Sequence, residues 1–332
     1  MREGEELRER EVEEVEVGGS KSGKSRAFDL GLFLRDTYND FLGSTYIPGS
    51  VEARCSDVNR TKESSNLILK GLFPAAEVPI KSEDKIEDVL FFPQICPEYV
   101  MDYLNANEKP DVKEELAKLE DFMENLSKWT GKNITSSIDM YLLYTTLDTE
   151  KFMNLTLPSW TNGIYPDGDL LNGTLLEFKI MNYDEKMRKR NGGRLIKKIK
   201  ENMESVENGS MDENRKLMLY GAHDLNVVAV LEALGVFHSH VPKFSSAVIV
   251  ELHLIEKAYY VKINYYLGVP AEVKTLRIPE CETLCPLDQF SNLMKNVIPS
   301  DLDFECEKLR KEPDFDFETD SGTVETFKKI FS

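Results

Sequence analysis

Four consecutive residues, Gly221-Ala222-His223-Asp224, carry the clearest chemical signal in the chain. They follow the apolar run KLMLYGA and precede DLNVVAVLEALG, so they lie where a buried strand ends and a helix begins. Open α/β sheets place their ligand crevice at such strand ends, and a helix N-terminus favours an anion there. His223 can titrate near neutral pH and Asp224 can give or take a proton, which suits acid–base chemistry. In the structural alternative, Asp224 caps the helix and His223 is a core residue.

Arg54 is a second candidate, in the polar stretch VEARCSDVNRT. A guanidinium binds phosphate well because its planar fork offers two parallel hydrogen bonds. Taken alone, an arginine of this kind is more often part of a surface ion pair. We expect Arg54, His223 and Asp224 to converge on one crevice at the strand ends, since a phosphoryl group touches all three only at short range.

A nucleotide-binding string lies near the N-terminus, where residues 18–25 read GGSKSGKS. In a P-loop the backbone amides cradle phosphates, and Lys24 would reach the β- and γ-oxygens. That motif follows a buried hydrophobic strand, whereas the Glu-rich EVEEVEV precedes this string. A P-loop nucleotide binder is therefore only a remote alternative.

Metal ligands are not grouped convincingly in the sequence, and we predict no metal site. His238 and His240 alternate in FHSH without an evident third ligand. Cys281 and Cys285 resemble half a zinc site, but no second pair stands nearby, so a local disulfide is the better interpretation. Six glycosylation sequons and five cysteines favour a secretory chain. The sequon asparagines are Asn59, Asn125, Asn133, Asn154, Asn172 and Asn208.

The composition excludes several function classes. The chain has 332 residues, 41% of them hydrophobic, enough for a core and about two units. Its 41 basic and 59 acidic residues give a net charge of −18, which disfavours nucleic acid as a partner. No run of about 18 apolar residues exists, so we expect no membrane span. Because the start is rich in Glu and has no apolar segment, we expect no signal peptide there.

The hydrophobic pattern predicts the elements that hold the candidate residues. It indicates helices over residues 26–41 and 64–71, and a polar helical region over 79–208. A strand and a helix ending at Gly235 surround His223. AVIVELHLIE and AYYVKINYYL read as a β-hairpin that turns at Glu256 and Lys257, followed by a cysteine-bearing loop and a last helix.

Several of these segments together resemble the histidine acid phosphatases. YIPGSVEARCSDVNRTKESSNLILKGLFPA and KLMLYGAHDLNVVAVLEALGV fall in the family's order, as do YYLGVPAEVKTLRIP and PECETLCPLDQF. They resemble the secreted and lysosomal branch that includes venom acid phosphatases, over residues 23 to 299 or so. Members hydrolyse phosphomonoesters through a phosphohistidine, without a metal or other cofactor.

The resemblance implies roles for three residues. Arg54 matches the third arginine of the phosphate clamp, and His223 matches the second histidine, which hydrogen-bonds the phosphoryl oxygens. Asp224 matches the general acid that protonates the leaving oxygen. The resemblance also implies a small phosphomonoester substrate and a secreted or lysosomal location. A homodimer is possible on the same ground.

The chain departs from the family at its start. The signature RHGxRxP, with the nucleophilic histidine and two more clamp arginines, has no counterpart before the first helix, and all four histidines lie in the C-terminal third. Cys55 and Asn59 replace the usual Ser and Asp. We therefore expect a truncated or mis-assembled N-terminus on an acid phosphatase body, and no phosphatase turnover. A non-catalytic secreted glycoprotein, a pseudophosphatase, is the alternative.

The predicted fold is an α/β core sheet of the histidine phosphatase kind, flanked by helices, with a helical cap and with the first core strand missing. Residues 23–78 and 209–310 form the core and 79–208 the cap, between a disordered acidic Gly/Ser leader (1–22) and an acidic tail (311–332). We predict disulfides between Cys281 and Cys285 and between Cys96 and Cys306, with Cys55 as the free thiol.

Overall fold

The computed structural model describes residues 21–268, 270–301 and 303, and these form two compact units. The first unit is a mixed α/β unit that draws on the described residues up to Pro93, on Arg188–His238 and on the described residues from Pro242 onward. The second is helical and draws mainly on Gln94–Met187. The predicted α/β class with flanking helices is confirmed. No described helix has the length and apolar character needed to cross a membrane.

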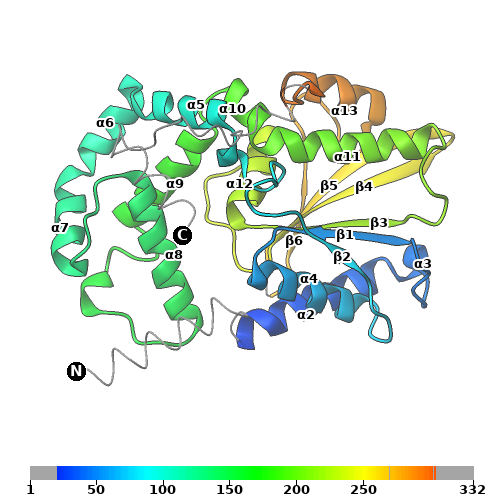
Figure 1. The fold of residues 1–332 in the computed structure, drawn as a ribbon, viewed down its shortest axis with the longest axis horizontal. Coiled ribbons are helices and arrows are strands. Elements are labelled where there is room, and N and C mark those ends of the chain that lie inside the picture. The colour runs from blue at the N-terminus through cyan, green and yellow to red at the C-terminus, as the bar shows by residue number, and fades with distance from the viewer. Residues whose placement is uncertain (1–20, 269, 302, 304–332) are drawn as a thin grey trace, which may run out of the picture. The chain divides into compact units, whose positions relative to one another are not determined.

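The strands of the first unit form two sheets (Figure 1). β1 (Val51–Cys55) pairs in parallel with β2 (Ile80–Lys81) on one side and with β3 (Leu217–Gly221) on the other. In the second sheet, β5 (Ala258–Tyr266) lies between β4 (Ala247–Ile255) and β6 (Val273–Leu276), all antiparallel, and also pairs with β7 (Cys285–Pro286). The predicted hairpin is confirmed, and Glu256 and Lys257 make its turn with positive φ angles of 48° and 72°.

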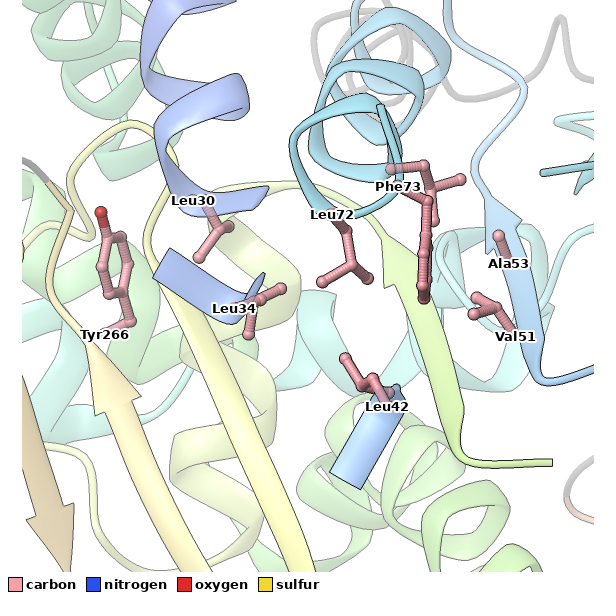
Figure 2. Close-up of a cluster of buried hydrophobic side chains, with 9 residues drawn as sticks. Leu30, Leu34, Leu42, Val51, Ala53, Leu72, Phe73 and Tyr266 are labelled. Carbon is pink, nitrogen blue, oxygen red and sulfur yellow. The ribbon is translucent and has the colours of Figure 1, made fainter. Parts of the chain in front are cut away.

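The two sheets share one layer of core side chains, shown in Figure 2. Helices α2 (Lys21–Thr37) and α4 (Asn59–Leu72) lie on one face of the sheets, and α11 (Gly192–Glu207) lies on the other (Figure 1). α2 and α4 approach closely, because a Cβ at Gly31 would lie 2.2 Å from the carbonyl oxygen of Ile68. The cluster also takes in α3 (Asn39–Leu42). Its buried members are Leu30, Leu34, Leu42, Val51, Ala53, Leu69, Leu72, Phe73 and Tyr266.

β3 and β4 each have one unpaired edge. Within the described residues, β3 pairs only with β1, and β4 pairs only with β5. Yet Leu219 of β3 and Ile249 of β4 pack against the same core cluster. All five residues of β3 are half-buried, although an apolar strand in the middle of a parallel sheet is normally buried on both faces. The apolar side chains of β3 and β4 are thus only partly buried by the neighbouring described elements.

The predicted helices are present with different limits. The helix predicted over 26–41 is α2 followed by α3, and the one predicted over 64–71 starts earlier, at Asn59. The helix after His223 is α12 (Asp224–Ala233), and Gly235 follows its end with a φ of 69°. The last helix is α13 (Leu287–Leu293).

The helical unit is narrower than the cap predicted over 79–208. β2 and residues up to Pro93 belong to the first unit, and α11 packs against α12 there. The helical unit contains these helices: α5 (Pro97–Asn107), α6 (Pro110–Lys118), α7 (Glu120–Thr130), α8 (Ser137–Phe152) and α9 (Asp169–Met181). α10 (Glu185–Arg190) spans the boundary between the units. The predicted leader (1–22) and tail (311–332) lie outside the described residues, except that 21–22 begin α2.

The disulfide prediction is confirmed for one pair. Cys281 and Cys285 are bonded, with their Cα atoms 5.5 Å apart, and Cys55 is a buried free thiol. Cys96 is also disulfide-bonded, but its predicted partner, Cys306, lies outside the described residues.

Candidate functional site

The candidate residues gather where β1 and β3 end. The two strands are parallel and Cys55 is opposite Gly221, so their carboxyl ends meet at one edge of the sheet. Arg54 is the last residue but one of β1, and its side chain lies on the face opposite the buried Ala53 and Cys55. His223 follows β3 by two residues and is the N-cap of α12.

Arg54 is held by two carboxylates. Its Nη2 lies 2.7 Å from Oδ1 of Asp88 and 2.9 Å from Oε2 of Glu83, and its guanidinium lies over the ring of Phe91 at 5.6 Å. Asp88 is fully buried, and this burial raises the pKa of its carboxyl despite the neighbouring Arg54. Nε of Arg54 and Oδ2 of Asp88 are buried without a hydrogen-bond partner. Among the described residues they are unsatisfied polar atoms, which an ordered water would satisfy, but a ligand would reach them only after a rearrangement.

His223 is held by a chain of hydroxyl groups. Its Nε2 lies 3.0 Å from Oγ of Ser56, which lies 2.8 Å from Oγ1 of Thr61. Both hydroxyl residues are buried. Burial, followed by the positive charges of Arg60 and Lys85, lowers the pKa of His223 to about 4. The imidazole is therefore neutral at pH 5 and above.

The backbone around His223 is fixed by Asn226. Oδ1 of Asn226 accepts from the backbone N–H of His223 at 3.1 Å, and its Nδ2 donates to the carbonyl of Phe91 at 2.9 Å. Phe92 contacts the imidazole with ring centroids 5.5 Å apart. Residues 88–92 therefore contact both Arg54 and His223, and they connect the ends of β1 and β3.

The structure changes one part of the sequence interpretation. The N-cap of α12 is His223, not Asp224, which is the first residue of the helix. The role of Asp224 as a general acid stays a prediction, as does phosphate binding by Arg54 and His223. Four buried residues of the site were missed in the sequence. They are Ser56, Thr61, Asp88 and Asn226.

The P-loop alternative is contradicted by the part of the string that the structure describes. Residues 21–25 form the first turn of α2, so they cannot make the open loop that surrounds a phosphate. Lys24 instead pairs with Glu63 of α4 at 3.5 Å. Residues 18–20 lie outside the described part of the chain. Within the part of the chain that the structure describes, His238 and His240 belong to no group of three or more metal-ligating side chains.

A pocket of about 550 Å³ lies at the end of β1. Cys55 and Asn59 line it together with Lys24, Lys62 and Ile80, whereas Arg54 and His223 do not. Burial raises the pKa of the Cys55 thiol, so this cysteine is a poor nucleophile near neutral pH. Asn59 is exposed at the first position of α4.

Comparison with known proteins gives one family. Residues 11–266 match the family described as Histidine phosphatase superfamily (branch 2). The chain is 40% identical over 301 residues to venom acid phosphatase Acph-1 of Apis mellifera, covering 87% of this chain and 78% of that protein. It is 28% identical over 309 residues to the human lysosomal acid phosphatase, covering 87% and 72% of the two chains.

Several phytases of known structure share this fold. The phytase of Citrobacter braakii matches with a TM-score of 0.63 and 15% identity, over 84% of this chain and 88% of that one. The apo form of the Hafnia alvei phytase matches with a TM-score of 0.63 and 16% identity, over 84% and 87%. At this identity the likeness concerns the fold alone.

Proposed function

Because the chain belongs to branch 2 of the histidine phosphatase superfamily and is acid phosphatase-like, we propose that the edge of β1 and β3 binds phosphomonoesters. Arg54 and His223 hold the phosphoryl group, and Asp224 lies beside the leaving oxygen as the general acid. The observation that carries the proposal is the shared contact of Arg54 and His223 with residues 88–92. It puts a guanidinium and an imidazole at neighbouring strand ends, where α/β sheets bind ligands.

Binding without turnover is the activity that the sequence of 332 residues favours. Its four histidines are His223, His238, His240 and His253, and none precedes Arg54. His253 pairs with Glu251 within β4, and His238 and His240 follow the far end of α12. His223 can orient a phosphoryl group, but no second imidazole accompanies it to form the covalent intermediate.

The unpaired edges of β3 and β4 support the expectation that the family's first core strand is missing here. A strand between them would pair with both edges and would be covered by helices on both faces. Its carboxyl end would lie beside His223, because β3 ends there. A transcript read through the 5′ end tests this: a coding sequence for RHGxRxP supports the enzyme, and an uninterrupted leader supports the binding protein.

A second candidate function is a non-catalytic secreted glycoprotein that keeps the phosphate site. All six sequon asparagines are exposed, and a disulfide is present between Cys281 and Cys285. A secretory location is also what the venom and lysosomal relatives suggest for this chain. Treatment of protein from a secretory host with an N-glycosidase tests sequon use through the loss of mass.

The central experiment is to express residues 1–332 in a secretory host and to measure both binding and hydrolysis of phenyl phosphate near pH 5. We expect binding that weakens at least tenfold in Arg54→Ala, and no hydrolysis above background. Hydrolysis that disappears in His223→Ala would contradict the absence of turnover. Hydrolysis that persists in that variant would indicate a contaminating phosphatase.

A further inference from the structure

Both tryptophans of the chain lie together on the surface of the helical unit. Trp129 lies near the C-terminus of α7, and Trp160 lies in the short 3₁₀ helix η2 (Ser159–Thr161). Their indoles are stacked, with ring centroids 5.9 Å apart and an angle of 19° between the planes. Trp129 is nevertheless 44% exposed, although an indole is a large apolar group that is buried in most folded proteins. Trp160 therefore covers only part of the Trp129 ring.

A glycosylation sequon lies one helical turn before Trp129. It consists of Asn125, Leu126 and Ser127, and Asn125 is exposed on α7. Residues four apart lie on the same face of a helix, with Cβ atoms about 5–6 Å apart, and long side chains lean toward the N-terminus of the helix. The indole of Trp129 therefore leans toward the turn that contains Asn125. A group attached to Nδ2 of Asn125 emerges beside this ring.

The other five sequons lack this arrangement. Three of their asparagines follow the C-terminal end of a helix: Asn133, Asn154 and Asn208. Asn59 lies in α4, where the residue one turn later is the charged Glu63. Asn172 lies in α9, where the residue one turn later is the buried Leu176. Asn125 is thus the one sequon asparagine in a described helix that has an exposed aromatic ring one turn further on.

The sugar that a sequon carries fits an open indole. The first sugar of an N-linked glycan is N-acetylglucosamine, and one face of its ring consists of C–H groups. When this face packs on an aromatic ring, apolar surface of both groups leaves water, while the hydroxyl groups at the edge of the sugar stay solvated. Glu124 and Lys128, which pair at 2.9 Å, place solvated charges next to the indole on α7. One ring with charged neighbours is far smaller than the surface that a stable protein partner covers.

We propose that Asn125 carries an N-linked glycan whose first sugar packs against the indole of Trp129. The proposal goes beyond the phosphate site and rests only on the secretory location proposed above. The co-reactant is a lipid diphosphate-linked oligosaccharide of the secretory pathway. Nδ2 of Asn125 forms a bond to the anomeric carbon of the first sugar, and the bond from that carbon to the lipid diphosphate breaks. The diphosphate leaves with the bonding electrons and takes up the proton that the amide nitrogen loses.

The hydrogen bonds of Ser127 indicate that this transfer precedes the folding of α7. Oγ of Ser127 donates to the carbonyl of Met123 at 2.9 Å and accepts from the backbone N–H of Ile134 at 2.9 Å. The hydroxyl by which the sequon is recognised is therefore engaged in the folded protein. It is free only in the unfolded segment, so the sugar meets Trp129 when the helical unit folds.

The test uses tryptophan fluorescence, which reports on this pair alone because Trp129 and Trp160 are the only tryptophans in the sequence. The full chain is expressed in a secretory host that adds high-mannose glycans, and peptide mass mapping measures the occupancy of Asn125. One sample keeps its glycans, a second is treated with an endoglycosidase that leaves the first sugar, and a third with an amidase that removes the whole glycan. We expect equal emission from the first two samples. The third should emit at longer wavelength and be quenched more strongly by acrylamide.

Three variants identify the asparagine that is responsible. Asn125→Gln should show the emission of the amidase-treated protein, and the amidase should no longer change it. Asn172→Gln removes a sequon of the same helical unit and is the matched control, so it should respond to the amidase like wild type. Asn133 is the competing sequon just after α7. If Asn133→Gln abolishes the response to the amidase while Asn125→Gln retains it, the proposal is wrong.

The wild-type measurements alone also decide the question, so the result does not depend on the folding of a variant. If other sequons are occupied but Asn125 is bare, or if the amidase leaves the emission unchanged, the proposal is wrong while the secretory location stands. If no sequon is occupied, both fail. If the exposure of the tryptophans depends on protein concentration, a second copy covers the indole and the proposal is wrong. An occupied Asn125 with an emission that changes only when the first sugar is removed supports the proposal.

Discussion

Asp88 and Glu83 bind the same atom of Arg54, at 2.7 Å and 2.9 Å from Nη2, but their side chains differ completely in exposure. The side chain of Asp88 is 0% exposed and that of Glu83 is 55% exposed. One guanidinium therefore binds both a buried and a solvated carboxylate, which allows the two to be compared. Only the buried one also accepts a backbone N–H, from Leu90 at 3.2 Å.

We expect Asp88→Ala to lower the free energy of unfolding by about 1.5–3 kcal/mol, since it removes a buried charge-assisted hydrogen bond to Arg54 and the acceptor of the backbone N–H of Leu90. Glu83→Gln should change it by less than about 1 kcal/mol, because exposed ion pairs contribute little. Urea unfolding of both variants at pH 7 measures the difference. Equal effects of the two substitutions would show that the burial of Asp88 does not determine its contribution to the free energy of unfolding.

Gly221 and Ser65 are a second pair of residues whose substitution should change the stability of the protein. A Cβ at Gly221 would lie 2.0 Å from Oγ of Ser65 and 3.0 Å from Cβ of Cys55. We expect Gly221→Ala to destabilise the protein by about 1–3 kcal/mol through overpacking at the end of β3. Adding Ser65→Ala removes the nearer atom and should restore at least about 1 kcal/mol. Urea unfolding of the two single variants and the double variant checks this, and purely additive effects would contradict it.

The sequence predicted the elements around His223 well because local signals define them. The apolar run before Gly221 and the glycine after the helix delimit β3 and α12, and Glu256 and Lys257 mark the hairpin turn. The start of α4 was missed because its first turn, NRTKE, is polar. Thr61 is buried there, and its hydroxyl makes hydrogen bonds with Ser56 and with the carbonyl of Val58.

Buried polar residues were the part that the sequence did not predict. Asp88 lies in the acidic stretch SEDKIED, and it is buried because Arg54, 34 residues earlier, meets it across the fold. Ser56 is separated by 167 residues from His223, the residue it holds. Such partners depend on strand register and on loop packing, which composition and periodicity do not encode.

The disulfide between Cys281 and Cys285 offers a third prediction. It closes a loop with a sequence separation of 4, and Cys285 is also paired with Val261 of β5. For so short a loop the chain-entropy account gives about 2 kcal/mol. We expect a variant with Cys281→Ser and Cys285→Ser to lose about this much in urea unfolding. A variant is preferable to a reducing agent, because reduction would also open the disulfide of Cys96.

Glu177 of the helical unit provides a prediction on pH. It is fully buried on α9, where Oε1 accepts from Tyr103 at 2.9 Å and Oε2 accepts from Ser137 at 2.6 Å. Burial raises the pKa of this carboxyl from 4.5 to about 7, and the negative charge of Asp139 adds to the effect. Between these two pH values the folded protein therefore binds one proton more than the unfolded chain.

The stability that this proton contributes is complete below about pH 4.5 and is lost as the pH rises to about 7. Glu177→Gln resembles the protonated form and does not titrate. We expect the difference in unfolding free energy, wild type minus Glu177→Gln, to fall by about 3 kcal/mol between pH 4.5 and 7, as measured by urea unfolding. Other titrating groups, including His223, cancel in this difference. Glu124→Gln, at an exposed position of α7, is the control and should show no comparable change. A constant difference across this pH range would show that the pKa of Glu177 is not raised in the folded protein.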